Sequence, residues 1–446
     1  MPVSFNHLLS RDHLSRRAFL RLGALTVAGF AAGCATNPVT GESQLMLVSE
    51  ESEIQIDKRN SPYQFSADYG ILQNVELNNY IQQVGQKMVA STHRTRMPYS
   101  FRGVNATYVN AYAFPGGSIA VTRGILLQLD NEAELAALLG HELGHVNARH
   151  TAQQMSKGML TQAIVGGVSA YAGTQSSALG DLTSTLGMIG AGALLASYSR
   201  GNEREADALG MAYMVQSGYG TDGFVGLMGI LKDLSRQKPS TTDLLFSTHP
   251  WSGERYQTAV EAAGTRYAYA RQKPLYKERY MDHTAKLRSI KSAVEEMQKG
   301  DKEMAAGKYG QAEAHYKAAL KQAPGDYTGL VVMAKCMLQQ KKYAEAGKYA
   351  GQAQKVYPQE AQAHYLAGLV KLGEKEFEPA YKDFSTYDQV LPGNPTILFL
   401  KGYSLEGMNQ IKPAAEHYYR FLQVVQQGPQ AQHAYKRLVE WGYIKR

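Results

Sequence analysis

The sequence of 446 residues predicts a mainly α protein in two parts, a globular part with a small β-sheet and then an α-solenoid. Three observations predict this fold class. A 34-residue period runs through the last third of the chain, a strongly helix-forming run lies at 131–150, and short β-type runs lie at 101–104 and 118–121. Hydrophobic residues make up 44% and charged residues 19%, which excludes a disordered chain and a polytopic membrane protein.

The period appears in columns of similar residues that recur every 34 positions. These are the prolines Pro324, Pro358 and Pro392, the alanines Ala312, Ala346, Ala380 and Ala414, and the small residues Gly300, Ala334, Gly368 and Gly402. An aromatic residue also recurs in the second helix of each unit, at Tyr316, Phe384 and Tyr418, with Ala350 in its place in the second unit. This pattern resembles the tetratricopeptide repeat. We expect four repeats from about residue 293 to 428 and a capping helix, in a repeat domain spanning 293–446, whose concave surface binds peptides.

Residues 1–33 read as a targeting segment ahead of Cys34. Its apolar run of 12 residues, 22–33, is too short to cross a bilayer of about 30 Å as a helix. Arg16 and Arg17 ahead of Phe-Leu resemble a twin-arginine signal, and the residues before Cys34 resemble a lipobox, which makes Cys34 the lipidated residue. An uncleaved amino-terminal anchor is the alternative. Both readings predict a periplasmic protein tied to a membrane, and Ala35, which is not Asp, favours the outer membrane.

Any active site must lie between Cys34 and the repeats, so we expect a domain at 34–275 and a linker at 276–292. Within this domain, the Gly-, Ala- and Ser-rich segment 158–196 predicts a mobile helical flap rather than a membrane insertion. The net charge is +8, but no cluster of Lys and Arg indicates a nucleic-acid partner.

Residues 131–150 contain the candidate metal-binding and catalytic residues. Asn131 can cap a helix, with Glu134 three residues later. On that helix His141 and His145 stand one turn apart on one face, so both imidazoles can reach one metal ion. Glu142 is placed to hold a metal-bound water, and the whole forms the H-E-x-x-H pattern of zinc peptidases. The alternative is a solvated helix with two surface histidines.

A third metal ligand must come from elsewhere. His150, five residues after His145, is expected to face about 140° away on a continuous helix. The best source is a second helix in which Glu203 and Asp207 share a face, whereas Glu205 is expected to face about 200° away from Glu203. One of the two acids can bind the metal while the other orients a ligating histidine. Spacing alone leaves open which acid is which, and a plain salt-bridged helix remains an alternative.

With these motifs the chain resembles the Ste-twenty-four and HtpX-like family of zinc endopeptidases. The matching segments are His-Glu-Leu-Gly-His at 141–145, Glu-Arg-Glu-Ala-Asp at 203–207, Thr-His-Pro at 248–250 and Asn-Pro-Val-Thr-Gly at 37–41. The resemblance implies a gluzincin-type metalloprotease domain with one Zn²⁺ per chain, held by His141, His145 and Glu203. It also implies that Asp207 orients a ligand and that His249 can act as a latch, or fourth ligand. The alternative for His249 is a structural role in its loop.

The expected function is a zinc endopeptidase of the bacterial envelope that degrades misfolded or unassembled outer-membrane proteins, which the repeats recruit. Its partners would be unfolded envelope proteins and the outer-membrane protein assembly machinery, and Glu142 would be the catalytic base. Substrate would pair with an edge strand formed by Gly117, Ser118, Ile119, Ala120 and Val121. The alternative is a lipid-anchored chaperone or assembly scaffold whose protease site is mostly latched.

Overall fold

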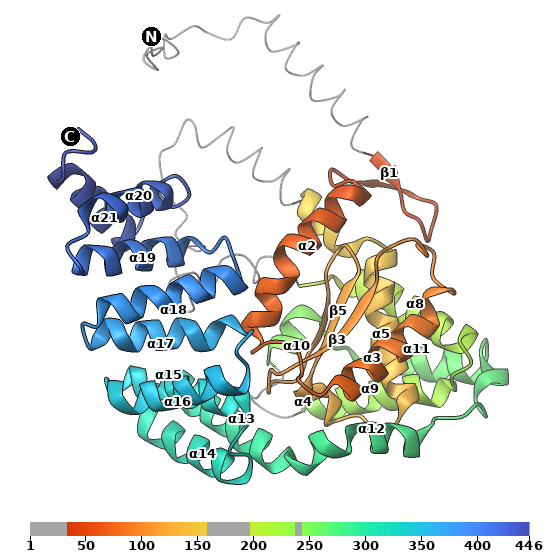
Figure 1. Cartoon of the computed structure of the whole chain (residues 1–446). Helices are drawn as coiled ribbons and strands as arrows, with labels where there is room; N and C mark the ends of the chain where they lie inside the picture. Colours follow the sequence, from red (N-terminus) through yellow and green to blue (C-terminus); the bar gives the residue numbers. More distant parts are fainter. Residues whose placement is uncertain (1–33, 158–196, 237–242, 446) are drawn as a thin grey trace, which may run out of the picture.

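The computed structural model describes residues 34–157, 197–236 and 243–445 (Figure 1). The predicted targeting segment at 1–33 and the predicted flap at 158–196 lie outside the described residues. Within the described ranges, no helix combines the length and the apolar character needed to cross a membrane.

The first part of the chain is built mainly from helices around one small sheet. Its helices are α2 (Glu50–Ala67), α3 (Val75–Val89), α4 (Arg123–Leu126), α5 (Glu132–Asn147), α8 (Arg200–Gln216), α9 (Thr221–Ser235), α10 (Asp243–Thr248), α11 (Gly253–Gly264) and α12 (Lys277–Ser289). Its strands are β1 (Cys34–Thr36), β2 (Ser43–Leu45), β3 (Ser100–Val104), β4 (Ala111–Ala113) and β5 (Ser118–Thr122). Strands β1 and β2 form a separate antiparallel pair that begins at Cys34.

The main sheet corrects the predicted edge strand. Its strand order is β3-β5-β4, so β5, which holds the predicted residues Ser118 to Val121, is the central strand. It pairs in parallel with β3 and antiparallel with β4. The prediction was wrong because the chain between β3 and β5 folds back as β4 and occupies the second side of β5. Gly117 lies in the turn before β5, with φ of +102°. The outer strand on that side of the sheet is therefore β4.

Helices α5 and α8 approach one another closely. Asn131 caps α5 as predicted, because its side chain accepts a hydrogen bond from the backbone N–H of Glu134 at 2.9 Å. A Cβ atom at Gly144 would lie 2.8 Å from the backbone of Ala206, and one at Gly140 would lie 2.9 Å from the carbonyl oxygen of Gly210. These glycines are required here because backbone, rather than a flexible side chain, fills the space a Cβ would take.

The second part of the chain consists of antiparallel helix pairs that stack side by side (Figure 1). The pairs are α13 (Lys291–Ala305) with α14 (Tyr309–Gln322), α15 (Tyr327–Gln339) with α16 (Tyr343–Val356), α17 (Ala361–Gly373) with α18 (Phe377–Val390), and α19 (Pro395–Gly407) with α20 (Ile411–Leu422). Helix α21 (Pro429–Glu440) follows at the end of the stack. The predicted α-solenoid is thus confirmed.

Small residues in the first helix of a pair make room for the aromatic residue of the second. A Cβ atom at Gly300 would lie 2.3 Å from the ring of Tyr316, and one at Gly368 would lie 2.5 Å from that of Phe384. The second repeat lacks the aromatic residue and has Ala350, and there the facing column has Ala334 instead of glycine. Both alanines are fully buried. The departure from the repeat pattern is therefore compensated in volume.

The segment assigned to a linker is part of the folded structure. Helix α12 covers most of 276–292, and its Tyr280 is fully buried in the core of the first part. The Tyr280 hydroxyl donates a hydrogen bond to the carbonyl oxygen of Leu126 at 2.6 Å. Residues 276–292 therefore pack against the first part rather than forming a free connector.

The two parts of the chain are held together by buried polar contacts. Arg123 donates to both carboxylate oxygens of Asp326, at 2.6 and 3.1 Å, and both side chains are buried. Thr328 donates to the carbonyl oxygen of Asn105 at 3.1 Å, and the Glu360 carboxylate accepts from Ser66. Burial alone would raise the pKa of Asp326, but the adjacent Arg123 guanidinium holds that pKa below its usual value.

Replacing Gly144 tests the close approach of α5 and α8. Gly144→Ala should lower the free energy of unfolding by about 1–3 kcal/mol, because the added methyl group meets the backbone of Ala206. The matched control is Gly201→Ala in α8, where the nearest atom to a Cβ is 3.6 Å away and a gain of up to about 1 kcal/mol is expected. Urea denaturation measures both, and equal effects would contradict the packing argument.

Replacing Arg123 tests the interface between the two parts. Arg123→Ala should cost about 3–5 kcal/mol at neutral pH, because it leaves Asp326 buried and unpaired. The folded-state pKa of Asp326 is depressed, so the pair stabilises the fold above the unfolded pKa of about 3.9 and loses that contribution as pH falls through the lower folded value. The difference from wild type, measured by urea denaturation, should therefore shrink below about pH 4.

The control for this experiment is the exposed pair of Lys286 and Glu76, 3.8 Å apart. Lys286→Ala should cost less than about 1 kcal/mol. If Arg123→Ala costs no more than this control, the buried pair does not hold the two parts together.

Candidate metal centre

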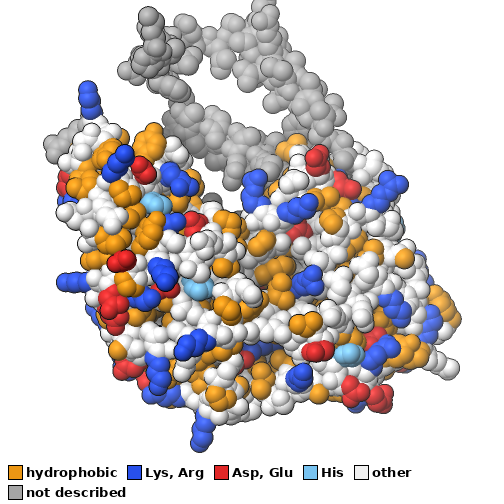
Figure 2. All heavy atoms as spheres, in the orientation of Figure 1, with side chains coloured by type: hydrophobic (Ala, Val, Ile, Leu, Met, Phe, Trp, Pro, Cys, Tyr) orange, Lys and Arg blue, Asp and Glu red, His pale blue; other side chains and the backbone are white. Residues whose placement is uncertain are grey.

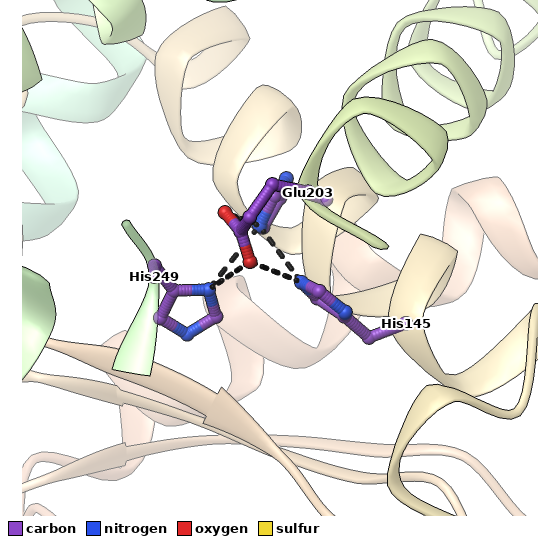
Figure 3. Close-up of side chains that lie close together, drawn as sticks. His145, Glu203 and His249 are labelled. Carbon is purple, nitrogen blue, oxygen red and sulfur yellow. Dashed lines mark hydrogen bonds and ion pairs between the residues drawn. The ribbon is translucent and has the colours of Figure 1, made fainter. Parts of the chain in front are cut away.

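Four buried side chains from three segments of the first part converge on one point. His141 and His145 come from α5, Glu203 from the first turn of α8, and His249 from the residue after α10. One donor atom from each lies within 4.8 Å of all the others. Figure 3 shows the Glu203 carboxylate next to the rings of His145 and His249. The close packing of α5 and α8 is what brings Glu203 to the two helix histidines.

The separations between these donor atoms suit a small tetrahedral cation. The Nε2 atoms of His141 and His145 are 3.0 Å apart, and Glu203 Oε1 lies 3.3 Å from His145 Nε2. His249 Nδ1 lies 3.2 Å from Glu203 Oε1 and 3.4 Å from His141 Nε2. Bonds of about 2.0–2.1 Å to zinc in a tetrahedron place ligand atoms about 3.3 Å from one another. The residues present therefore fit such an ion.

The protonation of the two helix histidines also suits a metal. Asp207 Oδ1 lies 2.9 Å from His141 Nδ1. A carboxylate only accepts hydrogen bonds, so His141 Nδ1 carries a proton and donates to Asp207, while Nε2 of the same ring faces the centre. Burial lowers the pKa of His145 well below its usual value, so that ring is neutral at pH 7. The Nε2 atoms of the two rings face one another at 3.0 Å, as the ligands of a shared cation would.

Arg255 fixes the two acidic side chains of α8 and was not found from the sequence. Its guanidinium donates to both oxygens of Asp207, at 2.6 and 2.7 Å, and its Nη1 lies 2.6 Å from Glu203 Oε2. Burial alone would raise the pKa of Asp207, but Arg255 holds it below its usual value. Arg255 lies on α11, outside every motif in the sequence, so no spacing rule could have indicated it.

Glu142 lies beside the four converging side chains. It is 1% exposed, and its Oε2 atom has no hydrogen-bond partner among the described residues. Its Oε1 atom lies 3.8 Å from His249 Nε2. Burial raises the pKa of the Glu142 carboxyl above its usual value, which increases its affinity for a proton. A buried carboxylate with a free oxygen can act as a base toward a molecule held in this centre.

His150 is not one of the four converging side chains, as expected, but it lies against His145 instead of facing away from it. His150 Nδ1 lies 2.9 Å from His145 Nδ1, and His150 Nε2 lies 3.2 Å from Glu205 Oε2. The angular argument assumed a continuous helix, but α5 ends at Asn147 and Arg149 adopts a left-handed conformation with φ of +59°. The chain reverses there and returns His150 toward His145. No glycine marks this turn in the sequence.

Comparisons with known proteins agree with this geometry. Residues 76–263 match the model of peptidase family M48, and residues 303–369 match a tetratricopeptide repeat model. A beta-barrel assembly-enhancing protease of Yersinia pestis is 28% identical over 313 residues, which cover 64% of this chain and 63% of that protein. The protein of the same name from Escherichia coli (strain K12) is 27% identical over 251 residues, which cover 55% of this chain and 50% of that protein.

A further relative is matched over a smaller share of the chain. Metalloprotease YcaL of Escherichia coli (strain K12) is 34% identical over 160 residues, which cover 36% of this chain and 60% of that protein. The chain spans between 40% and 63% of the length of the first three curated relatives that it matches. Residues 76–263 thus form a peptidase family M48 domain, and tetratricopeptide repeats follow it in the same chain.

Proposed function

We propose that this chain is a zinc-dependent endopeptidase of the bacterial envelope that degrades misfolded or unassembled outer-membrane proteins. The observation that carries the proposal is the buried cluster of His141, His145, Glu203 and His249 beside the free carboxylate oxygen of Glu142. In this proposal His141, His145 and Glu203 hold one Zn²⁺, while Asp207 orients His141. Three protein ligands leave a fourth position open, which distinguishes catalytic from structural zinc sites.

Glu142 is the general base of the proposed reaction. When bound, zinc supplies a Lewis acid that polarises the scissile carbonyl and acidifies water. Glu142 takes a proton from the attacking water and later delivers it to the leaving amine. Its burial favours the first step, because the raised pKa makes the carboxylate a stronger base than an exposed glutamate.

Strand β4 is the proposed docking site for an extended substrate. It is the outer strand on one side of the main sheet and packs against α5. Asn110 and Phe114 bond to β5, so by the two-residue alternation of strands the backbone groups of Ala111 and Ala113 face the other way. Ala111 and Ala113 are buried, so substrate pairing there requires the residues that cover β4 to move. Main-chain pairing would then accept many sequences, provided that the segment is unfolded.

The repeats are proposed to recruit substrates or the outer-membrane protein assembly machinery. Figure 2 shows hydrophobic side chains gathered where Figure 1 places the last repeats. Six large hydrophobic side chains of this region are between 38% and 64% exposed, namely Tyr403, Ile411, Tyr419, Val424, Tyr435 and Tyr443. Exposed apolar groups of this kind are typical of protein contacts. The names of the relatives as beta-barrel assembly-enhancing proteases favour partners of this class.

The protein is also proposed to be exported and anchored to a membrane. The twin-arginine pattern at Arg16 and Arg17 and the residues before Cys34 favour a periplasmic protein lipidated at Cys34, held at the outer membrane. Strand β1 begins at Cys34, so a lipid there would place the pair of β1 and β2 next to the membrane.

Glu142→Gln tests the proposed chemistry. The variant should lose cleavage of an unfolded, fluorescently labelled protein by about 10²–10⁴-fold, because glutamine cannot accept the proton. Bound zinc, measured by elemental analysis, should stay at the wild-type level, since Glu142 is not a ligand. The matched control is Glu254→Gln, an exposed carboxylate paired with Arg204, which should keep wild-type cleavage. Wild-type activity in Glu142→Gln would refute the assignment.

A latched scaffold is the second candidate function, and the position of His249 favours it. His249 Nδ1 lies as close to Glu203 and His141 as the zinc ligands lie to one another. Bound there, His249 would fill the fourth position and keep the enzyme inactive until its loop moved. The repeats would then supply a chaperone or assembly activity in the resting state.

His249→Ala separates a latch from a structural loop residue. If His249 is a latch, the variant should cleave an unfolded protein several-fold faster than wild type and should bind zinc more weakly. The control is His433→Ala in the repeats, a histidine that pairs with Glu406 at 2.8 Å. Unchanged or slower cleavage by a folded, zinc-loaded His249→Ala protein would rule out the latch.

A further inference from the structure

We infer that His150 and Glu205 are positioning residues that hold the orientation of His145 through its Nδ1 atom. The inference rests on the proposed function, because it concerns how one of the proposed zinc ligands is prepared. The residues form a chain of contacts that leads away from the centre, from His145 Nδ1 to His150 Nδ1 at 2.9 Å and from His150 Nε2 to Glu205 Oε2 at 3.2 Å.

The last member of the chain of contacts fixes one donor. The Glu205 carboxylate can only accept, so His150 donates to it from Nε2. On the other side, His145 presents Nε2 to the centre, where this atom lies 3.3 Å from Glu203 Oε1 and 3.0 Å from His141 Nε2. A metal bound at Nε2 leaves the ring proton of His145 on Nδ1, which faces His150 Nδ1. The relay thus holds the His145 ring with Nε2 toward the metal.

Burial makes this arrangement specific. His145 and His150 are each 1% exposed, so water does not compete for the bond between them. The ring of Tyr198 stacks on His145 with centroids 3.7 Å apart and limits its rotation. Both helix histidines thus have a partner on the Nδ1 side, Asp207 for His141 and His150 for His145.

The backbone turn that places His150 next to His145 is stabilised by the side-chain contacts of Arg149. Arg149 adopts the left-handed conformation, which is unfavourable for a residue other than glycine. Its guanidinium donates to Glu53 at 3.1 Å and to the carbonyl oxygen of Val48 at 2.7 Å. These buried bonds hold the turn and keep His150 in reach of His145.

The relay ends at the segment that follows Cys34. Asn37 Nδ2 lies 3.4 Å from Glu205 Oε1, while Oδ1 of the same side chain accepts from the backbone N–H of Val39 at 2.8 Å. Glu205 is therefore held from two sides although its side chain is 26% exposed. The Asn-Pro-Val-Thr-Gly motif thereby contacts the proposed zinc site through Glu205 and His150.

Zinc affinity, measured by competition with a chelator, tests the relay without relying on cleavage. His150→Phe keeps a flat ring but removes both hydrogen bonds, and it should weaken zinc binding about 10–100-fold. His150→Gln should recover part of this loss, because an amide can accept from His145 and donate to Glu205. Glu205→Ala should weaken binding less than His150→Phe, and Glu205→Gln less again, since its carbonyl oxygen still accepts.

A second readout and a matched control separate positioning from general damage. In the cobalt-substituted protein, the visible absorption of the metal should change in His150→Phe and return toward wild type in His150→Gln. The control His315→Phe removes another histidine that pairs with a glutamate, Glu296 at 2.8 Å in the repeats, and should leave zinc affinity unchanged.

The outcomes distinguish the relay from the proposed function. If the wild-type chain binds no zinc, the proposed function itself fails. If wild type binds zinc and folded His150→Phe binds it within twofold of wild type, the relay is overturned. Should His150→Phe fail to fold, Glu205→Ala decides, because its side chain is partly exposed and its loss leaves no cavity.

Discussion

Helices α5 and α8 touch through their backbones, and the candidate centre depends on this contact. Gly140, Gly144 and Gly210 lie where a methyl group would collide with the facing helix. Larger residues would separate the two axes, and ligand bonds of about 2 Å tolerate little separation. His141 and His145 meet Glu203 only because both backbones come close along the same stretch. The glycine in His-Glu-Leu-Gly-His therefore serves the metal site through packing rather than through chemistry.

The contact between α5 and α8 also has an electrostatic cost, because it buries carboxylates and histidines together. Burying a charge is tolerated when it is paired and hydrogen-bonded. Arg255 pairs with Asp207 and Glu203, while Asp207 and His150 occupy the Nδ1 atoms of the two helix histidines. One donor atom each from His141, His145, Glu203 and His249 remains within 4.8 Å of the others. The surrounding residues thus select the ligand atoms, and a cation is the group that best satisfies them.

The parts of the fold that depend on residues close together in the chain could be predicted from the sequence. The period of 34 predicts the helix pairs, and Asn131 predicts the start of α5. The errors arise where the answer lies in distant contacts. Strand β5 is central because β4 folds back beside it, and His150 reaches His145 because buried bonds hold Arg149 in a left-handed turn. The local sequence indicates neither the central position of β5 nor the turn at Arg149. Arg255 belongs to none of the motifs.

The repeats contact the first part of the chain next to β4, the proposed substrate strand. Thr107 donates to Asp301 at 3.0 Å and Asn105 accepts from Thr328 at 3.1 Å, so the repeats hold the segment that leads directly into β4. Arg123, just after β5, is paired with Asp326. Both strands of this side of the sheet are thus tied at one end to the solenoid. A partner that shifts the first repeats would therefore also shift the proposed substrate strand, β4. For this reason the repeats are better described as a support of the proposed active site than as an independent binding domain.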